Sequence, residues 1–339
     1  MLRIKFLLLA SGVLLLGNTP GNDMPVALAP YIVDGELKAD DFGWMRGAFD
    51  GATDQQKADW QALSKWAGTC GVSEQKAMIA ELAQMDVQTE LKEFGSMGPP
   101  ACPSVQSFQR LATQTKNWSE FVANEARARE IFLIYQYGAK IATQNMPYEK
   151  AWGSDDSWDL LGRTIFEQAY RRGFSWQSDP KAPKLDSAIV PYLNAHFQNA
   201  GHREDSKNTA FLKKHVAEKG WPTIKSVGKR ASGNAWLLVQ HADHDPAFQL
   251  KALRLMEPLA AKGEVSKGNY AYLYDRVMLK LAGKQRFGTQ FSGCDGDEYT
   301  LRPLENEKRL TELRLQYDLE PISKYRKSMK DSFGPCRSG

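Results

Sequence analysis

The sequence lacks the standard motifs that identify a chemistry directly. It contains no His-Glu-x-x-His zinc helix, no Gly-x-Ser-x-Gly nucleophile turn and no Cys-x-x-Cys pair. Gly228-Lys229 lacks both the earlier glycine and the following hydroxyl residue of a phosphate-binding loop. The acidic run at 294–298 is too short for a calcium loop and fits a hairpin turn better. These absences exclude the zinc, nucleotide, serine-hydrolase and calcium sites that a sequence most readily reveals.

Long apolar runs are also scarce. The one near the start, residues 6–17, follows the basic residues Arg3 and Lys5 and is shorter than the roughly 20 residues of a membrane-spanning helix. This pattern is typical of a secretory signal peptide. We therefore expect residues 1–29 to be a signal peptide, cleaved after Ala-Leu-Ala at 27–29 or near residues 19–21. The alternative is an uncleaved membrane anchor.

Charge of one sign does not dominate. The net charge is +4, and no basic cluster stands out, which argues against a nucleic-acid partner. Hydrophobic residues make up 42% of the chain, enough for a proper core. We expect an exported protein, periplasmic or secreted, with no stable membrane span after cleavage. Its expected partner is a small molecule or a component of the cell envelope, and the sequence assigns no cofactor and no metal.

Cysteine is limited to four residues, Cys70, Cys102, Cys294 and Cys336. An even number in an exported chain indicates disulfides, whereas free thiols would be the expectation for a cytosolic protein. Three pairings are possible. We favour Cys70 with Cys102 and Cys294 with Cys336, because each bridge then joins segments expected to share a domain.

Helical periodicity runs through both halves of the chain and predicts a mainly α fold. We expect a helical N-terminal region at 30–150 and a C-terminal domain at 151–339. One antiparallel β-hairpin is expected near 285–302, with strands at 285–291 and 298–302. The clearest predicted helices are at 54–63, 118–142, 206–219, 227–242, 246–262 and 269–282.

The densest polar cluster is at 240–246 and holds His241, Asp243, His244 and Asp245. It follows the apolar run 235–239, so it lies where a buried helix is expected to end. Histidine and aspartate are possible metal ligands or proton carriers. The structural alternative is that the two aspartates cap the next helix while the histidines bond to backbone groups.

Four strings carry a family resemblance. They are Gly-Trp-Pro-Thr at 220–223, Ala-Trp-Leu-Leu-Val-Gln-His-Ala-Asp-His-Asp-Pro-x-Phe-Gln at 235–249, Asn-Tyr-Ala-Tyr-Leu-Tyr-Asp-Arg-Val at 269–277 and Phe-Gly-Thr-Gln-Phe at 287–291. Together they resemble a bacterial domain family of unknown function over about residues 155–327. Further positions that fit the resemblance are Gln168, Arg171, Asp205 and Asn208. Phe287 stands where the family pattern leads us to expect Tyr. The resemblance implies no particular activity.

The first functional hypothesis is an enzyme, hydrolytic in type. His241 would be the general base, oriented by a carboxylate such as Asp243 or Asp275. Arg276 would hold an anionic group and Gln290 would position the substrate. We expect one pocket, lined by His241, His244, Asp275, Arg276 and Gln290, with Trp221 and Tyr274 at its wall.

Two other hypotheses remain open. One is a non-catalytic envelope module that binds a peptide, a glycan or a partner protein. The other is a metal-dependent enzyme, since His215, His244-Asp245 and Asp275 resemble the residue order of the helical HD phosphohydrolases.

Overall fold

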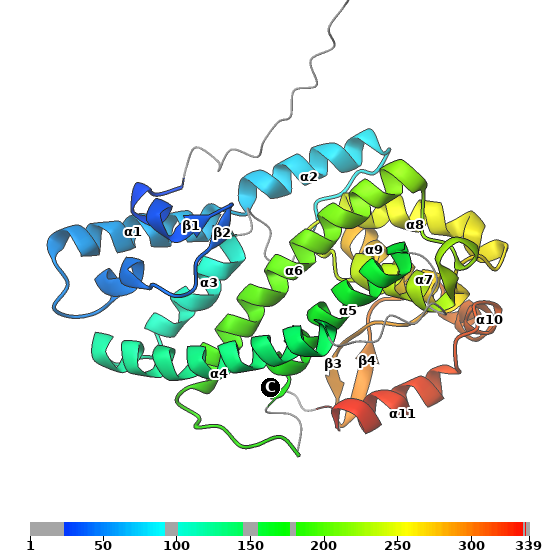
Figure 1. Ribbon diagram of the computed structural model, residues 1–339. Helices are drawn as coiled ribbons and strands as arrows, with labels where there is room; N and C mark the ends of the chain where they lie inside the picture. The colour runs from blue at the N-terminus through cyan, green and yellow to red at the C-terminus, as the bar shows by residue number, and fades with distance from the viewer. Residues whose placement is uncertain (1–23, 92–100, 145–154, 177–180, 335, 337–339) are drawn as a thin grey trace, which may run out of the picture.

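The computed structural model describes residues 24–91, 101–144, 155–176, 181–334 and 336 (Figure 1). Most of the expected signal peptide, residues 1–23, lies outside the described residues. The described chain is mainly helical, with two small antiparallel pairs of strands, so the predicted fold class is confirmed. Within it, no helix combines the length and the apolar character needed to cross a bilayer.

The N-terminal part packs around aromatic side chains. Its elements are η1 (Val26–Tyr31), β1 (Ile32–Val33), β2 (Glu36–Leu37), η2 (Gly43–Ala48), α1 (Asp54–Thr69), α2 (Val72–Gln84), α3 (Ala101–Ala112) and α4 (Trp118–Gln144). Thr53 begins α1 with a capping box, in which its side chain accepts from Gln56 N and the Gln56 side chain accepts from its backbone. We call the cluster that includes Phe42, Phe49, Phe108, Phe121 and Phe132 the first core.

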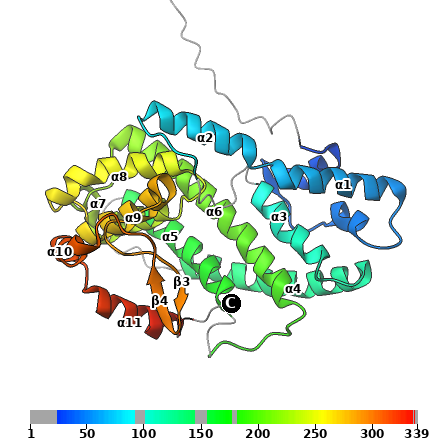
Figure 2. The same ribbon diagram turned by 180° about the vertical axis from the view of Figure 1, so that it is seen from behind.

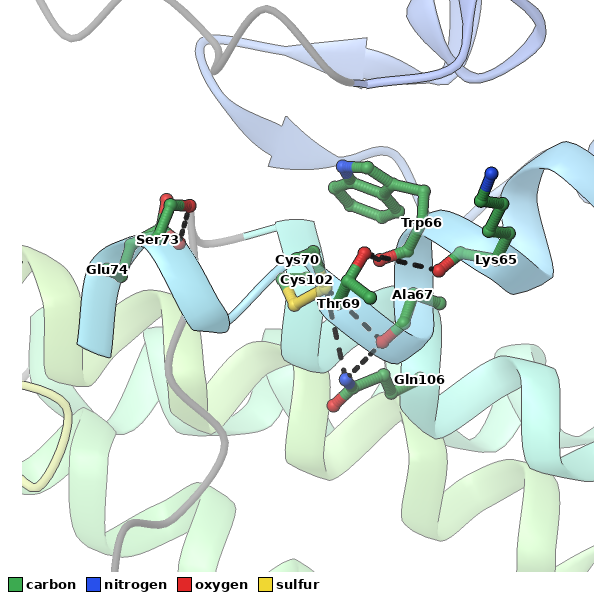
Figure 3. Close-up of a disulfide and its surroundings, with 9 residues drawn as sticks. All are labelled: Lys65, Trp66, Ala67, Thr69, Cys70, Ser73, Glu74, Cys102 and Gln106. Atoms are coloured by element: carbon green, nitrogen blue, oxygen red, sulfur yellow. Dashed lines mark hydrogen bonds between the residues drawn. A yellow bond between two sulfur atoms is a disulfide. The ribbon is translucent and has the colours of Figure 1, made fainter. Parts of the chain in front are cut away.

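Both predicted disulfides are confirmed. Cys70–Cys102 links the end of α1 to the start of α3 inside the first core (Figure 3). Gln106 stands beside it and donates from Nε2 to the carbonyl of Ala67 at 2.7 Å. Cys294–Cys336 joins the C-terminal hairpin to the end of the chain.

Two long helices connect the halves of the molecule. They are α5 (Asp155–Phe174) and α6 (Val190–Lys219), and α6 runs between α1, α3 and α4 on one side and α7 to α9 on the other (Figures 1 and 2). The first turns of α6 pack into the first core through Tyr192 and Phe197, and its last turns pack into a second core through Leu212 and Val216. The sequence predicted only residues 206–219 of α6, because the polar run at 201–206 interrupts the apolar periodicity.

The remaining helices are α7 (Ile224–Gln240), α8 (Pro246–Ala261), α9 (Lys267–Ala282), η5 (Glu307–Arg309), α10 (Leu310–Gln316) and α11 (Ile322–Phe333). The second core includes residues of α7, α8, α9 and α10, and its members include Trp221, Leu238, Phe248, Met256 and Phe287. Gly283 ends α9 in the left-handed conformation, with φ 71°. Leu82 of α2 also belongs to this core, so the N-terminal part contributes to it.

The predicted hairpin is confirmed, but its first strand lies further along the chain than expected. It consists of β3 (Phe291–Asp295) and β4 (Glu298–Leu301), paired antiparallel. The expected first strand at 285–291 is wrong except at Phe291, which begins β3. The rest of that segment is a loop, because three of its backbone N–H groups turn inward to one buried carboxylate, Asp275, instead of forming a ladder.

Candidate functional site

Two neighbouring helices, α5 and α7, bring a carboxylate and an imidazole together. Near their starts, Ser157 Oγ donates to the carbonyl of Val227 at 2.7 Å. Near their ends, Glu167 Oε1 lies 2.6 Å from His241 Nδ1. The Glu167 side chain is 1% exposed and that of His241 is 16% exposed, and His241 is the C-cap of α7. The contact uses Nδ1, so Nε2 is the ring nitrogen of His241 that does not face Glu167.

Glu167 is held by two more side chains from its own helix. Gln168 donates from Nε2 to Glu167 Oε2 at 2.7 Å, and Arg171 donates from Nε to Oε1. Burial raises the pKa of Glu167, but the hydrogen bond and charge of His241, together with the charge of Arg171, outweigh it and leave the pKa lowered. Glu167 is therefore ionised, and its carboxylate lies within ion-pair distance of the imidazole.

Arg171 extends this chain of contacts to α6. Its Nη2 donates to both carboxylate oxygens of Asp205, at 3.0 and 2.9 Å. Burial raises the pKa of Asp205 to about 7, against the lowering effect of Arg171 and with added repulsion from Glu167 and Asp243. One guanidinium thus joins two carboxylates that titrate in different pH ranges.

Two further histidines lie in the same neighbourhood. Burial, followed by the positive charges of His244 and Arg171, lowers the pKa of His202 on α6 to about 4. Burial also lowers the pKa of His244, although Asp245 and Asp243 oppose that shift. The sequence has only five histidines, and three of them, His202, His241 and His244, gather in this cluster.

The connection between α7 and α8 is clamped from two sides. Asp243 accepts from Arg276 Nε at 2.8 Å and also from Lys280, both on α9. Burial raises the pKa of Asp243, but Arg276 and Lys280 outweigh it, so the net shift is downward. Lys280 donates to Gln249 Oε1 at 3.0 Å, and Gln249 Nε2 donates to the carbonyl of Val239 at 3.0 Å. Arg276 therefore fixes the segment that carries His241 and His244.

Asp245 begins α8, as the structural alternative predicts. Its Oδ1 accepts from Phe248 N at 2.9 Å, and Pro246 occupies the first helical position. Lys213 of α6 forms an ion pair with its other oxygen. Asp243 instead bonds to side chains of α8 and α9.

Asp275 on α9 and Gln290 on the 286–290 loop are brought together through Thr289. Both carboxylate oxygens of the fully buried Asp275 are engaged, accepting from the backbone N–H groups of residues 286, 287 and 289 at 2.7–2.9 Å. Thr289 Oγ1 also donates to Asp275 at 2.9 Å, and Gln290 Nε2 donates to Thr289 Oγ1 at 3.1 Å. Burial raises the pKa of Asp275, and these bonds oppose the shift. The hydrogen bonds of Asp275 and Gln290 therefore hold the 286–290 loop, whereas His241 and Asp243 lie at the end of α7 and in the connection that follows it.

The two aromatic candidates have packing roles. Trp221 is buried in the second core. Tyr274 donates to Glu305 Oε1 at 2.8 Å, and the guanidinium of Arg286 lies 4.2 Å from the centre of its ring. Tyr274 therefore ties α9 to the segment after β4.

His215, proposed as a metal ligand, lies at the other end of the α5–α6 pair. Its Nδ1 is 3.9 Å from Asp156, which is about 16 Å along α5 from Glu167. Among the described residues, no group of three or more His, Cys, Asp or Glu side chains is arranged to hold a metal ion. The geometry gives the metal-dependent hypothesis no support.

Sequence reasoning missed Glu167. It stands seven residues after Leu160, on the side of α5 that Leu160 and Thr164 bury. A carboxylate on a buried helix face, with an arginine four residues later, is the signal that could have identified it.

Residues 190–336 match the model of a family that is described only as a family of unknown function (DUF6624). The predicted resemblance to such a family is therefore confirmed over this segment. The matched segment begins at α6, so α5 with Glu167 and Arg171 lies before it, although we expected the resemblance to start near residue 155. Comparison with curated proteins gave no match, and comparison with solved structures gave none either.

Proposed function

We propose that this protein is an exported enzyme in which His241, oriented by Glu167, acts as a general base on a small molecule or an envelope component. The observation that supports it is the 2.6 Å contact between His241 Nδ1 and the buried carboxylate of Glu167. Such a carboxylate fixes the imidazole tautomer and stabilises the imidazolium that forms when Nε2 takes a proton. Glu167 takes the orienting role that the sequence suggested for Asp243 or Asp275.

The position of His241 supports the same proposal. It ends α7, where the helix dipole stabilises a positive charge. Its side chain is 16% exposed, so the imidazole is not sealed from solvent, and the proposal requires that a water or a substrate hydroxyl reaches Nε2. Deprotonation of a water at this nitrogen makes hydrolysis the favoured reaction class.

The test is turnover of a panel of chromogenic esters, amides, phosphomonoesters and phosphodiesters. We expect one class to be hydrolysed, with a loss of about 10²–10⁴-fold in His241→Gln and Glu167→Gln. His215→Gln is the matched control, because it removes a buried histidine on the same helix pair outside the cluster. Full turnover in His241→Gln would contradict the proposal, as would failure of the wild-type protein to turn over any class.

Export is part of the proposal. The two disulfides support an oxidising compartment. Leu28 is 0% exposed in the first core, so cleavage after Ala29 would remove a core residue, and we favour the earlier site near residues 19–21. N-terminal sequencing of the mature protein should find a start before residue 26. An intact Met1 in a cytosolic fraction would contradict export.

The competing proposal is an envelope module that binds without turnover. A groove between α4 and α5 favours it, lined mainly by apolar side chains and backbone of Tyr135, Gly138, Ala139, Ala142, Ile165, Gln168, Ala169 and Arg172. Only Gln168 links this groove to Glu167. Ligand binding that is lost in Ala169→Trp but unchanged in His241→Gln would favour the module over the enzyme.

A further inference from the structure

The orientation of the Arg171 side chain depends on its contact with Asp205. Its side chain is 40% exposed, so the guanidinium has solvent-facing rotamers available. Asp205, 12% exposed on the neighbouring helix, accepts from Nη2 with both oxygens at 2.9 and 3.0 Å. Nη2 is thus held at Asp205 while Nε is held at Glu167 Oε1, so the two carboxylates together orient the planar guanidinium.

A second Glu–Arg–His group in the same chain lacks this element. In α4, Arg129 Nε lies 3.5 Å from Glu125 Oε1, and Glu125 lies 3.2 Å from His196. The Nη1 of Arg129 donates to the backbone carbonyl of Asp40 at 2.7 Å. The backbone carbonyl that Arg129 contacts cannot take up a proton, whereas the Asp205 carboxylate that Arg171 contacts can.

We propose that Asp205 is a positioning residue for His241: when ionised, it grips Arg171, which in turn holds Glu167 in line with the imidazole. This inference rests on the proposed function and adds a control by pH to the same site. Protonation of Asp205 removes one of the two charged acceptors and releases Arg171, so Glu167 loses its fixed orientation.

The groups around Asp205 place this change near neutral pH. Arg171 and Glu167 face it from α5, Asp243 faces it from the α7–α8 connection, and His202 on its own helix faces Arg171. Burial and the two neighbouring carboxylates raise the pKa of Asp205 to about 7, while Arg171 opposes them. The grip therefore strengthens as pH rises through about 7.

The test is labelling of the five histidines with diethyl pyrocarbonate, which acylates an unprotonated ring nitrogen, followed by peptide mass spectrometry. Rates for His241 are divided by those for His215 in the same sample, from pH 6 to pH 8. In Asp205→Asn, we expect the His241 ratio to fall about tenfold at pH 8 and less than twofold at pH 6. Arg171→Lys, which has no fork, should lower the ratio at both pH values.

The matched control is Arg163→Lys. Arg163 joins the same two helices through Asn208 Oδ1 at 3.3 Å, one turn before Glu167, and should leave the ratio unchanged. A ratio in Asp205→Asn that equals wild type, or that falls by the same factor at every pH, would overturn the inference. Glu167→Gln distinguishes failure of the positioning role from failure of the proposed function. If it lowers His241 labelling but Asp205→Asn does not, only the positioning role of Asp205 fails. If Glu167→Gln has no effect, the proposed function fails with it.

Discussion

The molecule contains the same polar arrangement twice. In each, a glutamate and an arginine lie four residues apart on one helix, and a histidine on another helix approaches the glutamate. The first is Glu125, Arg129 and His196 in the first core, and the second is Glu167, Arg171 and His241 where α5 and α7 end.

Their surroundings differ in every other respect. His196 is 1% exposed, and its ring centre lies 5.2–6.3 Å from those of Phe42, Phe108 and Phe132. His241 is 16% exposed, ends a helix and stands among ionisable side chains. Sealed among aromatic rings, a histidine–carboxylate pair stabilises the fold, whereas at a helix end it can exchange protons. Burial and neighbours decide the role, not the residue types.

The largest expected loss of stability comes from removing the Cys70–Cys102 bridge, which belongs to the first core. Its two cysteines are 32 residues apart, so Cys70→Ala/Cys102→Ala should lower the free energy of unfolding by about 4 kcal/mol. The bridge belongs to the first core, so turnover at His241 per folded molecule should not change. Urea unfolding measures the first quantity. The control is Cys294→Ala/Cys336→Ala, which opens a loop of similar length. A loss below 1 kcal/mol would show that the bridge does not constrain the unfolded chain.

The next effect compares the two histidines directly. His196→Ala should lower the free energy of unfolding by about 3 kcal/mol, because it opens a cavity among three phenylalanines and leaves Glu125 buried with fewer partners. His241→Ala should cost about 1 kcal/mol, since Arg171 and Gln168 still hold Glu167. Activity should follow the reverse order. Equal destabilisation by both variants would remove the distinction between the two groups.

Asp275→Asn should have a smaller effect than His196→Ala and should lower the free energy of unfolding by about 2 kcal/mol. The amide keeps one oxygen and presents an NH₂ group to backbone N–H donors, so part of the 286–289 loop loses its acceptor. Activity per folded molecule should persist if Asp275 only shapes the loop. Thermal unfolding and turnover on the same sample provide the test, with the Asp186→Asn surface variant as the control. A folded but inactive Asp275→Asn would show that Asp275 contributes to activity and does not only shape the loop.

Sequence patterns predicted the features that depend on neighbours along the chain. The cap at Asp245, the helix at 269–282 and the hairpin turn are local, and each is present. The cysteine pairing was also predictable, because each bridge joins segments that lie close along the chain.

The proposed partner of His241 was not predictable in the same way. Glu167 meets His241 only because α5 and α7 pack side by side, and periodicity along one helix does not reveal such a contact. Asp275 and Gln290 have the residue types of a site, but their hydrogen bonds are spent on a loop whose path depends on tertiary contacts.

The last expected effect concerns acid stability and His202. Its pKa is about 4 in the folded protein, against about 6.5 when exposed, because burial and the charges of His244 and Arg171 disfavour the imidazolium. Between pH 6.5 and pH 4 the unfolded chain binds a proton at His202 that the folded chain does not, so folding stability falls as pH falls through this window. We expect about 2 kcal/mol, after allowing for partial screening by solvent. Asp205 acts in the opposite direction over nearly the same range, since its raised pKa lowers stability as pH rises from about 4 to about 7. The measurement is therefore the difference between wild type and His202→Gln in urea unfolding at pH 4.5 and pH 7.5. The variant should lose less stability on acidification, whereas His215→Gln, at the other end of the same helix, is the comparison for a general effect of removing a histidine. A difference that is constant with pH would mean that His202 is not held neutral, and the polar cluster around His241 would then be no more sensitive to acid than the first core.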